Sequence, residues 1–208
     1  MTIKKTILQL CADTGSDTWP YRFDDRYEVI TIGADIGVEN YSPDRPIHGI
    51  IANPVCTEFS MARHGHDRAS DPEAGLWLVK ECQRVIDEAK PVWWALENPA
   101  SGTLKNYLGK PDFTYEPWHF GSPWTKRTAL WGNFNAPRRL YDSWEDVPKL
   151  GLYQRPGRGK PSMAFLHKSA FNLIPEFYES GMPAPQSDSE MRSICSQQFA
   201  QAFKKANP

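Results

Sequence analysis

The sequence predicts an α/β protein with a mostly parallel, twisted sheet flanked by helices. Short apolar runs rich in branched residues recur at 6–11, 27–32, 47–52 and 92–96, as buried strands do. A helix with an apolar stripe is expected between the last two runs. A strand, a helix and a strand within about fifty residues form a crossover unit, which makes the two strands parallel.

The first expected strand, 6–11, ends at a turn with one glycine, Gly15, followed by small polar residues. Such a turn opens many nucleotide sites, although an ordinary strand-to-helix turn explains the pattern equally well. The second strand, 27–32, ends at Gly33, and Asp35 follows it. A carboxylate at this place often accepts hydrogen bonds from a ribose, or it caps the turn.

The third strand, 47–52, is followed by Cys56, and the helix expected after it has clear start and stop signals. Ser70 is a capping residue, Pro72 fits the first turn, and Glu73 stands three positions after Ser70. Apolar residues then recur at helical spacing over 78–89, and Pro91 ends the helix. The fourth strand, 92–96, leads into Glu97.

Cys56 and Glu97 are expected to converge, because parallel strands end on the same edge of a sheet. A thiol at such an edge is either a packed small hydrophobe or a nucleophile. A carboxylate at a buried strand end costs free energy unless it is paired, protonated or used. Together the two groups suit the addition of a nucleophile to a ring that is protonated elsewhere.

The later part of the chain is less regular. We expect a short helix at 101–108, a strand at 128–131, an irregular basic insertion at 136–168 and a C-terminal helix at 189–205 packing back on the sheet. Aromatic residues interleave with Lys126 and Arg127, a pattern that can stack bases and neutralise phosphates. The whole chain, 1–208, is expected to be a single catalytic domain.

Composition excludes several classes of protein. Of the 208 residues, 40% are apolar, enough for a core, yet no apolar run approaches the ~20 residues that span a bilayer. The N-terminal stretch is too mixed for a signal peptide, so we expect a cytoplasmic protein. The four cysteines lie far apart without metal-ligand spacing, which suggests reduced thiols and no metal site.

The near-neutral net charge of −1 hides an asymmetry. Residues 121–168 contain nine basic and three acidic residues, a net charge of +6, and the remaining residues carry −7. This basic segment suggests a polyanionic partner, although a solvated loop face is the commoner explanation of such a pattern.

Two motifs resemble those of the DNA cytosine-5 methyltransferases, in particular the short phage and bacterial branch of that family. Residues 53–60 (Asn-Pro-Val-Cys-Thr-Glu-Phe-Ser) resemble the nucleophile motif, and residues 97–99 (Glu-Asn-Pro) resemble its Glu-Asn motif. The basic run 126–131 and the segment 192–203 stand where the family has a substrate-contacting strand and its last cofactor-side motif. The match covers most of the chain in the family's order.

The resemblance implies a Rossmann-like fold that binds S-adenosyl-L-methionine, or a modified form of it, and methylates C5 of cytosine in DNA, as in restriction-modification systems. It implies that Cys56 adds to C6 of the ring while Glu97 protonates the N3 side. The residues it assigns are, for catalysis, Cys56, Glu97 and Arg127; for the cofactor, Ala12, Asp13, Gly15, Asp35, Ile36 and Asn53; and for the substrate, Thr57, Glu58, Ser60, Asn98, Lys126, Arg138 and Arg139.

Departures from the family pattern keep two alternatives open. Asp13 stands where the family has a glycine of the cofactor turn, which favours a same-fold enzyme that places another group on cytosine of DNA or of a free nucleotide. The same change, with the basic segment, also fits a non-catalytic nucleic-acid-binding relative. The target-recognition domain is small or absent. Sequence specificity is therefore low, supplied by a second copy or a partner subunit, or irrelevant for a free cytosine nucleotide.

Overall fold

The computed structural model describes residues 3–12, 14–60 and 71–208. Its strands are β1 (Lys5–Leu10), β2 (Tyr27–Ile32), β3 (Gly49–Ala52), β4 (Trp93–Pro99), β5 (Phe113–Tyr115) and β6 (Thr128–Asn133). Its α-helices are α1 (Trp19–Arg22), α2 (Pro72–Ala89), α3 (Lys105–Leu108), α4 (Pro175–Tyr178), α5 (Asp188–Ser193) and α6 (Gln197–Ala206). Six short 3-10 helices complete the described elements: Ser16–Thr18, Val38–Asn40, Pro117–Phe120, Trp144–Asp146, Met163–Phe165 and Lys168–Leu173.

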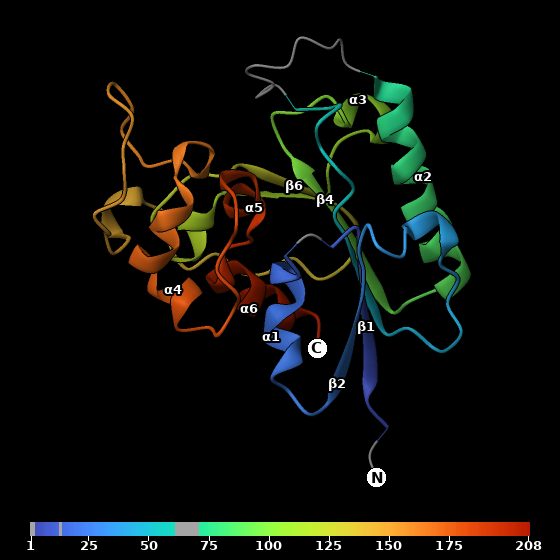
Figure 1. The fold of residues 1–208 in the computed structure, drawn as a ribbon. Helices are drawn as coiled ribbons and strands as arrows, with labels where there is room; N and C mark the ends of the chain where they lie inside the picture. Colours follow the sequence, from blue (N-terminus) through green and yellow to red (C-terminus); the bar gives the residue numbers. More distant parts are fainter. Residues whose placement is uncertain (1–2, 13, 61–70) are drawn as a thin grey trace. The chain divides into compact units, whose positions relative to one another are not determined.

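The six strands form one sheet in the order β2-β1-β3-β4-β6-β5 (Figure 1). The first four strands in this order are parallel to their neighbours, and β6 runs antiparallel to β4. This arrangement confirms the predicted α/β class with a mostly parallel sheet. Strand β2 lies on one side of β1, and β3 lies on the other side. The direction in which successive strands are added therefore reverses at β1. Open α/β sheets bind ligands at such a point, beyond the carboxyl ends of the strands.

The residues that flank helix α2 account for both of its ends. The Asp71 carboxylate accepts a hydrogen bond from the amide of Ala74 at 3.1 Å, and Pro72 occupies the first turn. Lys90 ends the helix in the left-handed conformation, with φ 47°, just before Pro91. The expected cap, Ser70, lies outside the described residues, and the observed cap is one position later.

One face of α2 packs on the sheet and closes the main hydrophobic core. The buried residues that the strands and the helix contribute to this core include Leu8, Leu10, Ile50, Leu96, Val79, Cys82, Val85 and Ile86. Cys82 is therefore a core residue, as its place in the helical stripe predicted.

Gly49 of β3 leaves space for the indole ring of Trp93 on β4. It pairs with Trp93 in the parallel register, and a Cβ at position 49 would lie 2.1 Å from the indole ring of Trp93. Trp93 itself is almost fully buried. The position of the Trp93 ring at the start of the two strands thus depends on a residue without a side chain.

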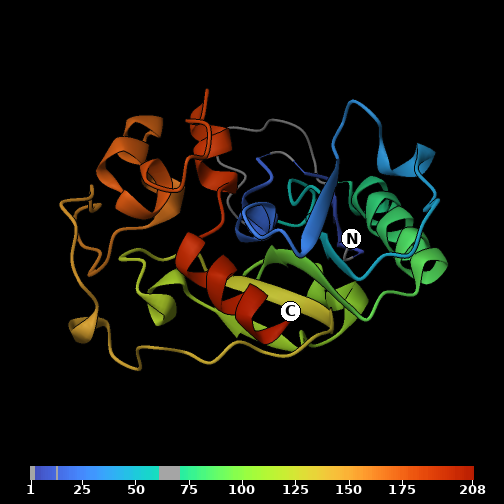
Figure 2. The ribbon, with the colours of Figure 1, turned by 90° about the horizontal axis from the view of Figure 1, so that it is seen from below.

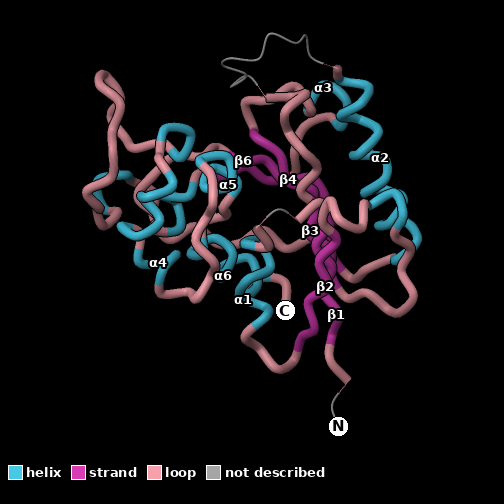
Figure 3. The backbone as a smooth tube through the Cα atoms, viewed as in Figure 1, coloured by secondary structure: helices cyan, strands magenta, loops and turns pink. Residues whose placement is uncertain are grey.

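The chain divides into two compact units, which we describe separately. The first unit comprises Met1–Ala12, Asp24–Thr114 and Thr128–Phe134, and holds most of the sheet. The second comprises Asp13–Phe23, Tyr115–Arg127 and Asn135–Pro208, and is built almost entirely of helices, 3-10 turns and loops (Figure 3). That the chain acts as a single domain stays a prediction.

The second unit differs from expectation in two ways. The C-terminal helix expected at 189–205 is two helices, α5 and α6, with extended residues between them (Figure 2). The described segment 136–168, predicted to be an irregular insertion, contains no α-helix and no strand, but it contributes Leu152 and Met163 to a hydrophobic core with Trp124, Phe171 and Phe177. Packing of the C-terminal helices on the sheet stays a prediction. No helix in the described part of the chain is long and apolar enough to cross a membrane.

Candidate active site

The carboxyl ends of β3 and β4 lie side by side in the first unit. The two strands pair in parallel, with Ala52 opposite Leu96, so Asn53 and Glu97 leave the paired region at the same edge. The side chain of Asn98 joins the two segments directly, because its Nδ2 donates to the carbonyl oxygen of Pro54 at 3.0 Å. The predicted parallel pairing of the two strands is confirmed. That the side chains of Cys56 and Glu97 converge stays a prediction.

Cys56 lies in a tight turn, and its own carbonyl oxygen accepts the hydrogen bonds that form the turn. The Cys56 carbonyl accepts from the amides of Phe59 at 2.9 Å and Ser60 at 2.8 Å. The residue is half-buried, whereas Val55 beside it is 51% exposed. Cys56 therefore lies in a hydrogen-bonded turn and is not sealed in the core.

Phe59 anchors this turn in the core. Its ring is 1% exposed, and a Cβ at Gly75 of α2 would lie 2.7 Å from it. The Phe59 carbonyl accepts from the amide of Thr103 at 2.9 Å, which ties the turn to the segment after β4. The family-like motif thus contains a packing residue, and Phe59 needs no contact with a ligand to explain its place.

The polar residues of the same motif have different surroundings. The Glu58 carboxylate accepts from the amide of Asp71 at 2.6 Å, at the start of α2. Thr57 and Ser60 are half-buried beside it. Glu58 therefore orders the entry to α2, and its assignment to the substrate stays a prediction, as do those of Thr57 and Ser60.

Glu97 and Asn98 belong to β4 and pair with β6, Glu97 opposite Leu130 and Asn98 opposite Ala129. Glu97 is half-buried, and Asn98 is completely buried. The Asn98 Oδ1 atom has no hydrogen-bond partner among the described residues. Sequence reasoning assigned Asn98 to the substrate but missed its bond to Pro54. The signal was present, since a buried amide must find a partner.

Four of the residues assigned to the cofactor lie at the ends of β1, β2 and β3. The Asn53 Oδ1 accepts from Gln9 Nε2 at 3.2 Å, and the Ala12 amide donates to the carbonyl of Ile32 at 3.1 Å. Asp35 and Ile36 are exposed beyond β2. The structure thus brings these four residues to one edge of the sheet, on both sides of β1.

Gly33 shows how closely the ends of β1 and β2 approach. A Cβ at this position would lie 2.9 Å from Asp35 Oδ1 and 3.3 Å from the Ala12 carbonyl oxygen. A carboxylate beside exposed backbone can bind ribose hydroxyls, and the missing side chain keeps the edge open. These residues therefore fit a nucleoside-containing cofactor such as S-adenosyl-L-methionine.

The remaining cofactor assignments fall elsewhere. Asp13 lies outside the described residues. Gly15 belongs to the second unit, in the left-handed conformation with φ 67°. Ser16 after it is fully buried, and its Oγ accepts from the amide of Cys195 at 2.9 Å. This part of the turn is bound into the second unit, and its role towards a cofactor stays a prediction.

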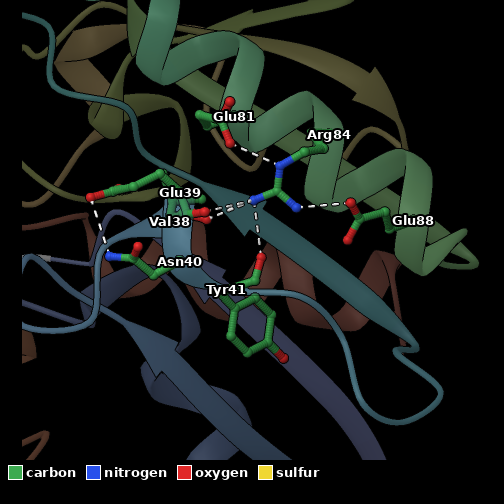
Figure 4. Close-up of polar contacts among 7 residues, drawn as sticks. All are labelled: Val38, Glu39, Asn40, Tyr41, Glu81, Arg84 and Glu88. Atoms are coloured by element: carbon green, nitrogen blue, oxygen red, sulfur yellow. Dashed lines mark hydrogen bonds and ion pairs between the residues drawn. The ribbon is translucent and has the colours of Figure 1, made fainter.

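Arg84 of α2 fixes the segment that follows β2, and sequence reasoning missed it (Figure 4). Its guanidinium pairs with Glu81 and Glu88, both at 2.8 Å. It also donates to the carbonyl oxygens of Val38 and Tyr41, both at 3.0 Å. Five fixed donors make arginine suited to such a node. The node holds the residues just beyond the cofactor candidates of β2.

The basic residues assigned to catalysis or substrate all lie in the second unit. Lys126 is half-buried, and its Nζ donates to the carbonyls of Ser193 and Ile194, both at 3.1 Å, at the end of α5. Arg127, Arg138 and Arg139 are exposed. Lys126 therefore stabilises a helix end, while the three arginines are accessible to an anion. Their roles in catalysis or nucleic-acid binding stay predictions.

Comparisons with known proteins give a distant structural likeness. No family model and no curated protein matches the chain. A prophage-encoded protein of E. coli, provisionally named a DNA modification methyltransferase, matches in structure with a TM-score of 0.44 and 16% sequence identity. The match covers 62% of this chain and 47% of that one, so the chain spans about half the length of that protein.

Proposed function

We propose that the chain is a DNA cytosine-5 methyltransferase that uses S-adenosyl-L-methionine. The observation that carries this proposal is the hydrogen bond from Asn98 to Pro54, which joins a cysteine turn to a glutamate strand at one edge of a parallel sheet. The motifs at 53–60 and 97–99 add the family resemblance to this geometry.

The proposed chemistry uses both groups. The Cys56 thiolate adds to C6 of cytosine while Glu97 delivers a proton to N3, so the electron pair of the 5,6 double bond becomes available at C5. S-adenosyl-L-methionine would supply the methyl group for C5, and Ala12, Asp35, Ile36 and Asn53 would hold it. Loss of the C5 proton to a base and expulsion of the thiolate restore the aromatic ring. A target base in duplex DNA must first leave the stack.

The experiment that tests the proposal combines product analysis with a covalent trap. Purified protein is incubated with cytosine-containing DNA and labelled S-adenosyl-L-methionine, and the nucleosides are analysed by mass spectrometry. A parallel DNA carries fluorine at C5 of cytosine. It offers no removable proton, so the bond between Cys56 and C6 should persist and appear as an adduct on the peptide that contains Cys56.

The expected result is 5-methylcytosine and a trapped adduct, both absent from Cys56→Ala. Cys195→Ala, which removes a buried thiol in the second unit, is the matched control and should keep both signals. A folded Cys56→Ala protein that still forms methylcytosine would overturn the covalent mechanism. No modified base from wild-type protein on any DNA would overturn the function.

A second candidate is transfer of another group to the same ring, favoured by Asp13 in the cofactor turn. A carboxylate there adds charge and bulk where the family has only backbone. The same mass spectrometry separates the two candidates, because a cytosine of another mass, formed with cell extract as the source of donor and lost in Cys56→Ala, identifies the second.

A further inference from the structure

An exposed loop in the second unit carries an unusual concentration of positive charge. Residues 147–175 contain five basic residues and no acidic residue: Lys149, Arg155, Arg158, Lys160 and Lys168. Within this stretch, residues 153–160, which we call the basic finger, form the orange loop that stands out from the helices of its own unit in Figure 1. The local charge pattern favours a polyanionic partner.

The tip of the basic finger is a defined turn. The amide of Arg158 donates to the carbonyl of Arg155 at 3.0 Å, with Pro156 and Gly157 between them. Gly157 has φ 77°, the conformation that a type II turn requires at its third residue, and proline suits the second. The side-chain amide of Gln154 also donates to the Arg158 carbonyl. The turn fixes the backbone from which both arginines project.

Both ends of the finger are anchored in the core of the second unit. Leu152 before it is 8% exposed, and Met163 after it is 1% exposed. The amide of Thr125 donates to the carbonyl of Pro161 at 2.9 Å, and the Met163 amide donates to Thr125 at 3.0 Å. The finger therefore has a fixed base, whereas residues 153–159 are all exposed.

The cations of the finger are supported by aromatic rings. The guanidinium of Arg155 lies 5.0 Å from the centre of the Phe165 ring, and Lys160 Nζ lies 4.4 Å from Trp118 and 5.1 Å from Trp144. Within residues 3–12, 14–60 and 71–208, no ion pair joins Arg155, Arg158 or Lys160 to a carboxylate. Cation–π contacts therefore orient Arg155 and Lys160 while leaving the guanidinium of Arg155 charged.

We propose that the basic finger binds the phosphate backbone of duplex DNA, with Arg155 and Arg158 as its main contacts. Guanidinium groups bind phosphate oxygens with two parallel hydrogen bonds, and a pre-ordered loop loses little conformational entropy on binding. The choice of DNA as the polyanion rests on the proposed function. The finger is then the element that holds duplex substrate, independently of the chemistry at Cys56.

The test is the salt dependence of duplex binding by the full chain. A fluorescent DNA duplex is titrated with the Arg155→Gln/Arg158→Gln double variant in the Cys56→Ala background, without cofactor, at several salt concentrations. Loss of two phosphate contacts should weaken binding about 10-fold at low salt and reduce the slope of log K against log salt by about 1.8. The matched control is Arg192→Gln/Lys205→Gln, which removes two exposed cations of the same unit.

An affinity and a slope equal to those of the control would overturn the proposal, provided that both variants melt at the parental temperature. A loss of binding to an acidic polypeptide with unchanged binding to DNA would also overturn it, in favour of a protein partner. The outcome is distinguishable from failure of the proposed function, because this assay involves neither Cys56 nor product formation. Reduced DNA affinity without any methylcytosine would leave the finger as a DNA contact in a protein of another activity.

Discussion

Buried polar groups have different surroundings in the two units. We compare the carboxyl ends of β3 and β4 in the first unit with the start of α6 in the second, which we call the helix junction. At the strand ends, Asn98 is fully buried with its Oδ1 unpartnered among the described residues. At the helix junction, the Glu176 carboxylate accepts from the Gln198 amide at 2.9 Å, and Ser196 Oγ lies 2.6 Å from Ser122 Oγ. Burial raises the pKa of Glu176, and the hydrogen bonds oppose that rise.

This difference suggests that the strand ends serve catalysis and that the helix junction serves stability. A closed network satisfies its members and rigidifies the fold, whereas an edge with spare acceptors is prepared for a ligand. Changes at the strand ends should therefore act mainly on turnover, and changes at the helix junction mainly on the free energy of unfolding. Four predictions follow from this division, beginning with the largest effect.

Glu97→Gln should reduce the turnover number about 10²–10⁴-fold, because the amide cannot deliver a proton to the ring. The free energy of unfolding should change by less than about 1 kcal/mol, since the two side chains have the same shape. Methyl transfer under saturating DNA and urea denaturation measure the two quantities. Glu73→Gln, an exposed change in the first turn of α2, is the control. Full activity in Glu97→Gln would remove the glutamate from the mechanism.

Asn98→Ala should lower both the turnover number and the free energy of unfolding, because Asn98 is buried and also joins the two strand ends. It leaves the Pro54 carbonyl without its donor, which should cost about 1–3 kcal/mol of stability and lower turnover by displacing the cysteine turn. Asn133→Ala, at the exposed end of β6, should change neither. A stable Asn98→Ala variant with normal turnover would show that the hydrogen bond does not position Cys56.

Ser196→Ala should reduce stability by about 1–2 kcal/mol while leaving the turnover number of the folded protein unchanged. Its Oγ caps α6 by accepting from the Phe199 amide at 3.1 Å and also meets Ser122 in the closed network. Ser193→Ala, which removes a hydroxyl that donates to a carbonyl of its own helix, should have the smaller effect. A selective loss of turnover in Ser196→Ala would contradict the division of roles.

His119 should make the free energy of unfolding depend on pH, and this effect arises in the second unit. Burial, and then the positive charges of Arg139 and Lys160, lower the pKa of His119 to about 4 from its ordinary value of 6.5. The unfolded chain therefore binds the proton first, and stability should fall as the pH decreases from 6.5 towards 4, with no such loss above 6.5. Solvent screening limits the effect to about 1 kcal/mol.

His119→Asn is the variant for this test, because its side chain can still accept from the Glu116 amide, as His119 Nδ1 does at 3.0 Å, but does not titrate. Urea denaturation at pH 7.5 and pH 4.5 should show a smaller loss in the variant than in the parent. Equal losses would assign the acid sensitivity to other groups.

Sequence predicted the first unit well and the second poorly, for a physical reason. Regular strands and α2 follow apolar periodicity, so 27–32 matches β2 in full and the parallel pairing of β3 and β4 could be deduced from the helix between them. The end of β4 extends through Glu97 to Pro99, because β6 continues to pair with it. That pairing involves residues far apart in the chain, which local patterns do not reveal.

The buried residues of the second unit do not recur at helical or strand spacing in the sequence. Leu152 and Met163 enter a core from segments without apolar periodicity, and the 3-10 helix Met163–Phe165 places Met163 there. Lys126 looked like a phosphate ligand, but its amine binds the end of α5, some 67 positions away in the chain. Arg84 carried no signal in the sequence, yet it donates to three backbone carbonyls. Only tertiary contacts distinguish these roles.

The meeting of Gly49 with the indole of Trp93 has a consequence for how this protein can change over time. Any side chain at position 49 would overlap a ring buried in the core, so the ring or the backbone at the start of the strands that lead to the cysteine turn and to Glu97 would have to shift. The two positions are therefore expected to vary only as a pair, with a smaller residue at 93 accompanying any larger residue at 49. Among descendants of this chain, that covariation would record selection on the geometry of a site lying at the opposite end of the same strands.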